Sequence, residues 1–294
     1  MIHGGGHLTL SRRAVRPLQT KFLLSQGILP VSIDYRLCPQ VNVIDGSMAD
    51  TRDACVWVQR DLPSIMARKG IEIDPTKLVV IGWSTGGTLA MTTSWTLRNA
   101  GLTPPRAILS FYCPVNYDPA APIIMGQEHG PRTMALDEIR NLLPSTPTTS
   151  HAFNSTDSSK LGWVHKGDPR SELTLALVKE HRGMSLLFNG LPTTGEELCE
   201  PDAERAREFS PLQHLLDGDY NVPTYLIFGD QDEIAPFPKA AEFAKALAST
   251  HVRSGILPVP GAKHIFDLGV APGSEAWDRT IGPGYDFLLQ ELER

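Results

Sequence analysis

Short apolar runs alternate with longer amphipathic stretches along much of the chain. The run Leu-Val-Val-Ile at 78–81 precedes a helix-length stretch, and Ala54, Val58 and Leu62 share one face of another. Strands that alternate with helices in this way indicate an α/β fold, with a mostly parallel sheet and helices on both faces. The pattern predicts strands at 28–34, 77–81, 106–115, 222–228 and 256–259, and helices at 13–26, 47–62, 85–99, 238–249 and 273–292.

The alternation breaks down between residues 116 and 215. Pro, Ser, Thr and Asn become frequent there, above all at 143–159, between helical stretches at 171–181 and 202–209. A long segment without strand–helix rhythm between two core strands is typical of a lid over a binding site. We therefore expect three parts: a first part of the core at 1–115, a lid or cap insertion at 116–215, and a second part of the core at 216–294.

Composition and charge exclude several classes of partner. Of the 294 residues, 41% are hydrophobic and 20% are charged, and the net charge is −6, which favours a large globular core and argues against a nucleic-acid partner. No apolar run approaches the ~18 residues that span a bilayer, and the start of the chain lacks a basic and apolar leader pattern. We expect a cytoplasmic protein with no membrane partner.

The four cysteines, Cys38, Cys55, Cys113 and Cys199, are widely separated and form no C-x-x-C pair. Isolated cysteines are among the residues most often buried, and they usually remain free thiols. A chain able to bury a large core has no need of a disulfide framework. The sequence therefore predicts free thiols, no metal site and no other cofactor.

The clearest chemical signal is Gly82-Trp83-Ser84-Thr85-Gly86. It follows the apolar run 78–81 and precedes a helical stretch, so a tight turn connects a buried strand to a helix. In a G-x-S-x-G motif of this kind the turn strains the backbone at the serine, and its small neighbours let strand and helix approach. Ser84 is the candidate nucleophile. The alternative, a helix-capping serine, leaves the flanking glycines unexplained.

A second signal is His3-Gly4-Gly5-Gly6-His7 at the start of the chain. Three glycines in a row let backbone N–H groups point together into a pocket without interference from Cβ atoms. Together with the N–H of Thr85, the N–H groups of Gly4 and Gly5 are candidates to hold the oxyanion of a tetrahedral intermediate.

Carboxylate and imidazole candidates follow much later. The apolar run 222–228 leads into a turn that carries Asp230 and Asp232, and His264 comes after Gly261 in a loop beyond the next predicted strand. The order Ser, Asp, His is the chain order of the α/β-hydrolase triad. His264 is the candidate base, with an ordinary loop histidine as the alternative. Either Asp230 or Asp232 can orient it.

These motifs resemble those of a known family. The resemblance to the hormone-sensitive-lipase branch of α/β-hydrolase esterases rests on His3-Gly4-Gly5-Gly6, Asp-Tyr-Arg-Leu-Cys-Pro at 34–39, the Ser84 elbow and the pair Asp232 and His264. A narrower resemblance, to the C-terminal thioesterase or releasing domains of fungal non-reducing polyketide synthases that also carry a methyltransferase domain, rests on 1–7, 82–87 and Phe-Tyr-Cys-Pro at 111–114.

The resemblance implies a serine hydrolase that cleaves a thioester or ester through an acyl-enzyme. The implied role is to release or trim a polyketide-type acyl chain, which an acyl carrier protein can present. The family pattern puts the acid three residues after Gly229, at Asp232, and implies that His3 braces the glycine loop. Trp83 and His7 are the candidates for substrate contact, although His7 can equally pack in the interior.

Two other functions stay open on the residues alone. A freestanding carboxylesterase that acts on small oxygen esters would use the same groups. A hydrolase-fold binding protein without catalysis is the other alternative, and the apparently complete set of Ser84, Asp232 and His264 argues against it.

The chain departs from the resembled family at its start. In that fold a central strand and two earlier strands come before the glycine loop, whereas here Met1 and Ile2 precede His3. We therefore expect the N-terminal strands to be missing, and the strands on either side of them to face a gap.

Overall fold

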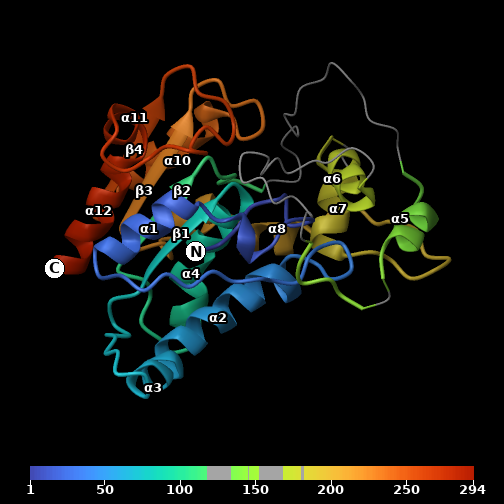
Figure 1. The fold of residues 1–294 in the computed structure, drawn as a ribbon. Helices are drawn as coiled ribbons and strands as arrows, with labels where there is room; N and C mark the ends of the chain where they lie inside the picture. The colour runs from blue at the N-terminus through green and yellow to red at the C-terminus, as the bar shows by residue number, and fades with distance from the viewer. Residues whose placement is uncertain (118–133, 145, 152–167, 180–181) are drawn as a thin grey trace.

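The computed structural model describes residues 1–117, 134–144, 146–151, 168–179 and 182–294. Within these residues four strands form one sheet in the order β1-β2-β3-β4, and every neighbouring pair is parallel (Figure 1). This confirms the predicted α/β fold with a parallel sheet. The strands are β1 (Val79–Trp83), β2 (Ala107–Phe111), β3 (Thr224–Gly229) and β4 (Ser254–Val259).

Helices precede, separate and follow these strands. Those of the sheet-bearing body are α1 (Pro17–Ser25), α2 (Ala49–Arg60), α3 (Leu62–Ala67), α4 (Thr85–Asn99), α10 (Phe237–Ala248), α11 (Glu275–Thr280) and α12 (Gly282–Glu293), with a short 3-10 turn η1 (Arg12–Ala14) and a π-helical turn η2 (Ile44–Met48). Between β2 and β3 come α5 (Leu136–Leu142), α6 (Pro169–Lys179), α7 (Arg182–Asn189), α8 (Ala203–Phe209) and α9 (Pro211–Leu216).

Helices cover both faces of the sheet, as expected. A Cβ atom on Gly284 of α12 would overlap Leu109, whereas one on Gly87 of α4 would overlap Ser110. Leu109 and Ser110 are consecutive residues of β2, so their side chains point to opposite faces. Consequently α12 and α4 pack on opposite sides of the sheet, and glycine at each contact allows the helix to approach closely.

The first two residues lie beside β1. The N–H of Ile2 donates to the carbonyl oxygen of Ile81 at 2.8 Å, and the N–H of Trp83 donates to that of Ile2 at 3.2 Å. On its other side Ile2 forms a parallel bridge with Ile33. The N-terminal residues therefore pair with the C-terminal end of β1. They partly fill the gap expected beside β1 where the N-terminal strands are missing.

Two sequence-based predictions of secondary structure are wrong. Residues 28–34 form no strand, because their pairing is limited to Met1 and Ile2 and because Pro30 has no N–H to donate. The helix predicted at 273–292 is two helices, because Pro283 stands in the first turn of α12 and cannot continue α11.

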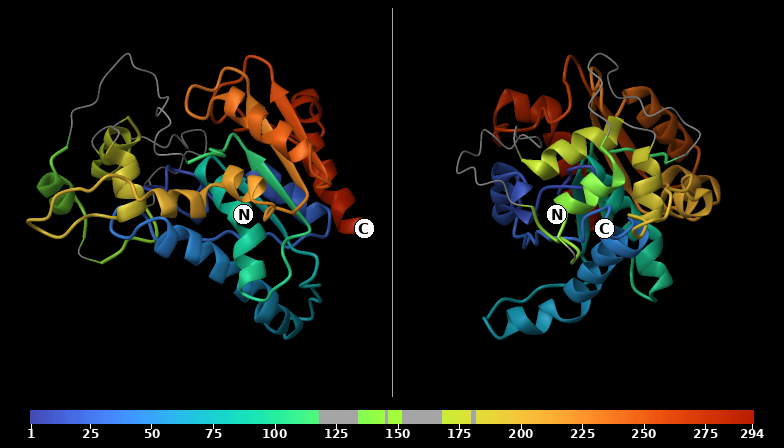
Figure 2. Two further views of the ribbon diagram at one scale, coloured as in Figure 1. Left: turned by 180° about the vertical axis from the view of Figure 1, so that it is seen from behind. Right: turned by 90° about the vertical axis from the view of Figure 1, so that its right-hand side faces the viewer.

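The predicted insertion at 116–215 separates into two sets of helices within its described part. α5, α6 and α7 lie at the end of the molecule far from α12 in both Figure 1 and the left view of Figure 2. α9 instead packs against α4 and α10, and α8 packs against η2 and α9. Residues 118–133, 145, 152–167 and 180–181 of this insertion lie outside the described residues.

The four cysteines are free thiols, with Cys38, Cys55 and Cys113 buried and Cys199 exposed. Among the helices in the described ranges, none has both the length and the apolar character needed to cross a bilayer.

Candidate active site

Ser84 occupies a strained turn between β1 and α4. Its backbone has φ 53° and ψ −131°, in the half of conformational space that L-residues rarely adopt. A Cβ atom on Gly82 would overlap the backbone of Gly86, and one on Gly86 would overlap the carbonyl oxygen of His3. The motif glycines therefore let strand, helix and glycine loop meet at the serine.

A continuous chain of hydrogen bonds connects Ser84, His264 and Asp232. The Nε2 atom of His264 lies 3.0 Å from Ser84 Oγ, and its Nδ1 atom lies 2.8 Å from Asp232 Oδ2. Because a carboxylate accepts but does not donate, Nδ1 carries the proton and Nε2 is free to accept from the serine hydroxyl. The side chains of His264 and Asp232 are 8% and 0% exposed, so water competes little for these bonds.

The turn after β3 holds Asp232 firmly. Its Oδ1 atom accepts the N–H groups of Ile234 at 2.8 Å and Ala235 at 2.9 Å, which leaves Oδ2 for the imidazole. Asp230, the other candidate acid, instead accepts the N–H of Gly261 at 2.7 Å. The structure therefore brings Asp232 to His264, and it gives Asp230 a bond that connects two turns.

The glycine loop lies against the elbow. A Cβ atom on Gly4 would overlap the carbonyl oxygen of Trp83 and the side chain of Ser84. Within the described part of the chain, the N–H groups of Gly4 and Gly5 donate no hydrogen bond. Thr85 is the first residue of α4, and the first N–H groups of a helix have no partner within it. These three amides are available beside Ser84.

His3 packs beneath this loop. Its ring stacks on that of Tyr35 with centroids 4.2 Å apart, and the Tyr35 hydroxyl donates to the carbonyl oxygens of His3 at 2.9 Å and Gly4 at 3.0 Å. Burial lowers the pKa of His3 to about 4, so the ring is neutral near pH 7. Its contacts are those of a residue that supports the loop.

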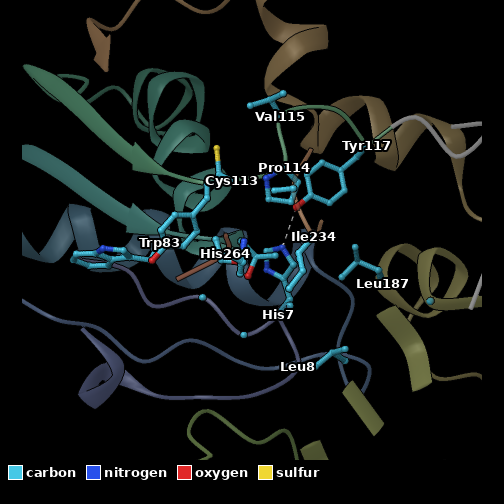
Figure 3. A pocket seen from close by; sticks show the side chains of 18 of the residues that line it. His7, Leu8, Trp83, Cys113, Pro114, Val115, Tyr117, Leu187, Ile234 and His264 are labelled. Carbon is cyan, nitrogen blue, oxygen red and sulfur yellow. Dashed lines mark hydrogen bonds between the residues drawn. The ribbon is translucent and has the colours of Figure 1, made fainter. Parts of the chain in front are cut away.

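A cavity of about 380 Å³ opens beside Ser84 and His264 (Figure 3). Its wall comes from the glycine loop, the elbow, the segment after β2, helix α7 and the turns that follow β3 and β4. Most of the lining is apolar, with Leu8, Val115, Leu187 and Ile234 among the side chains that face it. Such a cavity suits a mostly apolar ligand with a few fixed polar contacts.

His7 and Tyr117 place a polar pair in this apolar wall. The Nε2 atom of His7 lies 3.4 Å from the Tyr117 hydroxyl (Figure 3), and its Nδ1 atom lies 3.4 Å from Ser47 Oγ. Burial, with a smaller contribution from His3, lowers the pKa of His7 to about 3, so this imidazole is also neutral near pH 7. Sequence reasoning missed Tyr117, which carries no motif.

Trp83 borders the cavity, but its side chain is 1% exposed. Its indole N–H donates to Asp267 Oδ2 at 2.9 Å, and its ring stacks on Phe111 with centroids 5.7 Å apart. The indole is thus engaged with the protein interior. Asp267 was also missed, since the sequence offers no cue for it beyond its position shortly after His264.

Comparisons with known proteins agree with this architecture. A family model for the alpha/beta hydrolase fold matches residues 1–157. A non-reducing polyketide synthase of Acremonium egyptiacum is 74% identical over 293 residues, and one of Stachybotrys bisbyi is 63% identical over 294. Each match covers 100% of this chain but 14% and 13% of those relatives, so the chain spans a small part of their length.

A solved structure of similar fold is a thermophilic esterase of Thermogutta terrifontis. The TM-score is 0.58 at 21% identity, and the match covers 98% of this chain and 79% of that one. The expected resemblance to a domain of fungal non-reducing polyketide synthases is confirmed by the relatives, and the fold by both comparisons. The chain belongs to the α/β-hydrolase family.

Proposed function

We propose that this protein is a serine hydrolase that cleaves an acyl thioester or ester through an acyl-enzyme. The observation that carries the proposal is the chain of hydrogen bonds from Asp232 through His264 to Ser84 at the wall of an apolar cavity. A serine hydroxyl is a weak nucleophile at neutral pH, and an adjacent base oriented by a third group is what activates it.

In the first half of the reaction Ser84 Oγ attacks the acyl carbonyl carbon while His264 Nε2 takes the hydroxyl proton. Asp232 keeps the imidazole in the required tautomer and stabilises the imidazolium that forms. The N–H groups of Gly4, Gly5 and Thr85 stabilise the oxyanion, and removal of one such donor costs about 2.7–4 kcal/mol in known cases. When the intermediate collapses, the bond to the leaving thiol or alcohol breaks, and the leaving group takes the proton from His264.

In the second half a water molecule repeats the attack. His264 takes a proton from the water as its oxygen bonds to the acyl carbon, and the ester bond to Ser84 Oγ breaks. The proton returns from His264 to Ser84. The products are a carboxylic acid and the regenerated enzyme, and no cofactor takes part in this scheme.

For the substrate we propose a polyketide-type acyl group held as a thioester on an acyl carrier protein. The support is the similarity of this chain to parts of fungal polyketide synthases, together with the size and apolar wall of the cavity. A volume of about 380 Å³ lies in the range of drug-sized ligands and far exceeds an acetyl group.

His7 and Tyr117 are the polar contacts that we propose for this acyl group. They face the cavity from two different segments, and their mutual contact is long at 3.4 Å. A hydroxyl or carbonyl on the acyl chain can form a shorter hydrogen bond with either group. We expect such a bond to orient the chain, because a few polar groups in an apolar pocket fix the pose of a ligand.

A paired assay tests this proposal. The same aromatic acyl group is supplied as a thioester and as an oxygen ester, alongside acetyl versions of both. We expect the aromatic thioester to give the highest kcat/KM. A preference for small oxygen esters would favour the freestanding carboxylesterase, and absence of turnover of all four by folded protein would favour the binding protein.

A further inference from the structure

A buried carboxylate next to the proposed base has no part in the mechanism above. Asp267 follows His264 by three residues, and its side chain is 0% exposed. It accepts four hydrogen bonds, from Arg16 Nε, Gln19 Nε2 and Trp83 Nε1 at 2.9 Å each and from the Tyr112 hydroxyl at 2.6 Å. A carboxylate is costly to bring into the interior unless a countercharge and hydrogen bonds compensate it. The four donors therefore fix the position of this carboxylate.

The four donors come from the segments that surround the site. Trp83 directly precedes Ser84, and Tyr112 follows β2 at the cavity wall. Arg16 and Gln19 belong to the start of α1, and Arg16 also donates to the Tyr112 hydroxyl at 2.7 Å. Asp267 thus joins the loop of His264 to the elbow, to the end of β2 and to α1 through one carboxylate.

The charges within this cluster balance. Arg16 supplies one positive charge against the single negative charge of Asp267, at 2.9 Å. Burial acts to raise the pKa of the Asp267 carboxyl, but Arg16 and the hydrogen-bond donors outweigh it, so the net shift is downward. The carboxyl is therefore ionised near neutral pH, and its hydrogen bonds are of the strong, charge-assisted kind.

The histidine loop needs such a restraint. His264 lies in no helix or strand, and the next residue, Ile265, has φ 63°. This left-handed conformation is unfavourable for a β-branched residue. Residues in such conformations persist where their surroundings hold them, and Asp267 is a strongly bonded group on the far side of Ile265.

Tyr112 connects this anchor directly to the imidazole. Its ring meets the ring of His264 edge to face, with centroids 4.7 Å apart, while its hydroxyl is bonded to Asp267. A shift of the loop would therefore disturb both the ring contact and the carboxylate bond.

We propose that Asp267 is a positioning residue for His264, acting with Tyr112, Trp83 and Arg16 to hold the imidazole within reach of both Ser84 and Asp232. The proposal rests on the serine-hydrolase function proposed above. Asp267 touches no reacting atom in this account. Its effect is on the geometry of the base, and the chemistry belongs to the other three residues.

The test compares two tyrosines that each lose a hydroxyl. Tyr112→Phe removes the 2.6 Å donor to Asp267 and keeps the ring against His264. Tyr220→Phe is the matched control, because Tyr220 is buried, has a 2.6 Å contact with Thr224 Oγ1 and is absent from the cavity wall. We expect Tyr112→Phe to lower kcat about tenfold with KM within about twofold, and Tyr220→Phe to change neither, although both variants lose a buried hydrogen bond and should lower Tm.

A second variant covers the case in which Tyr112→Phe folds poorly. Trp83→Phe removes the indole N–H that Asp267 accepts, and it should give the same loss of kcat. Because both variants act through one carboxylate, the double variant should lose less than the product of the two single losses. A kcat equal to that of the Tyr220→Phe control in both single variants would overturn the proposal.

A crystal structure of each variant separates this inference from the proposed function. In Tyr112→Phe we expect His264 Nε2 to move away from Ser84 Oγ, or to occupy two positions, whereas Tyr220→Phe should keep the 3.0 Å separation. An unchanged imidazole in Tyr112→Phe contradicts the positioning role even if the protein hydrolyses nothing. A wild-type protein without turnover, together with a displaced imidazole in Tyr112→Phe, would contradict the proposed function alone.

Discussion

Two polar regions face the same apolar cavity, and they are bonded very differently. Around Ser84 the hydrogen bonds are short, at 3.0 Å to His264, 2.8 Å from His264 to Asp232 and 2.6 Å from Tyr112 to Asp267. Around His7 the contacts are long, at 3.4 Å to Tyr117 and 3.4 Å to Ser47. The first region is held in one geometry, and the second has room to exchange partners.

The proton arrangement in the second region supports this difference. Thr88 Oγ1 donates to the carbonyl oxygen of Pro114 at 2.6 Å, so at its 3.3 Å contact with Tyr117 it accepts. Tyr117 then has no proton left for His7 and accepts from Nε2, with one lone pair of its hydroxyl still unused. A catalytic group must be held in its reactive geometry before the substrate binds. A group that recognises a substrate benefits from a hydrogen-bonding position that no protein group occupies.

The largest expected effect comes from removing the candidate nucleophile at the centre of the first region. Ser84→Ala should reduce kcat by about 10⁶, the scale seen when a triad nucleophile is removed. Ser94→Ala, which alters a buried hydroxyl further along α4, is the control and should stay active. Steady-state kinetics with the aromatic thioester measures both. Substantial turnover by Ser84→Ala would contradict the assignment of the nucleophile.

Asparagine substitutions at the two candidate acids test which carboxylate orients His264. Asp232→Asn should lower kcat by about 10⁴, because an amide no longer holds the imidazole in the required tautomer. Asp230→Asn should change kcat by less than about threefold, because an amide oxygen can still accept the N–H of Gly261. The same thioester assay ranks the two variants, and the reverse ranking would show that the acid is misassigned.

Acid should weaken the fold through His7, which is buried in neutral form at the cavity wall. The pKa of His7 is about 3 when folded against 6.5 when unfolded, so as the pH falls below 6.5 the unfolded chain takes up a proton that the folded one does not. Stability present above pH 6.5 is therefore lost toward pH 3. Between pH 7 and pH 5 this histidine should lower the free energy of unfolding by about 2 kcal/mol.

His7→Asn isolates that contribution. Asparagine tolerates the left-handed backbone at this position, where φ is 63°, and it does not titrate. Urea unfolding at pH 7 and pH 5 should show a smaller loss in the variant than in the wild type, by about 2 kcal/mol. Equal losses in the two proteins would mean that His7 takes up its proton in the folded state as readily as in the unfolded chain, and would contradict the lowering of its pKa by burial.

The smallest effect is expected at the second region. Tyr117→Phe should lower kcat/KM about fivefold for an aromatic thioester that carries a ring hydroxyl, because one hydrogen bond is lost. The same acyl group without the hydroxyl is the internal control and should be processed at an unchanged rate. Equal losses on both substrates would show that Tyr117 shapes the cavity and does not read the substrate.

Local signals made part of this structure predictable from sequence. The helix predicted at 85–99 is observed at Thr85–Asn99, since glycines and an apolar strand fix its start within a few residues. The glycine loop and the elbow are likewise short motifs, whose chemistry depends on neighbours in the chain. The stretch 273–292 was predicted as one helix because its amphipathic pattern is continuous, although Pro283 is a local signal for a break between two helices.

What depends on distant partners was not predictable. Residues 28–34 have strand-like composition, yet strand formation needs a neighbour of matching length, and the neighbour here is the short segment Met1 and Ile2. Asp267 takes its donors from Arg16, 251 residues away, and from Tyr112, 155 residues away. Between Asp230 and Asp232 the residues alone left both open, because the choice depends on which carboxylate reaches His264 in the folded chain.

Covalent labelling tests the central claim most directly, namely that the first region, around Ser84, holds an activated serine. The protein is treated with a fluorophosphonate probe, and peptide mapping by mass spectrometry locates the adduct. We predict one adduct, on Ser84, that is absent in Ser84→Ala and forms more slowly in Asp232→Asn. A cooperatively folded wild-type protein that stays unlabelled, or that carries the adduct on another residue, would contradict it.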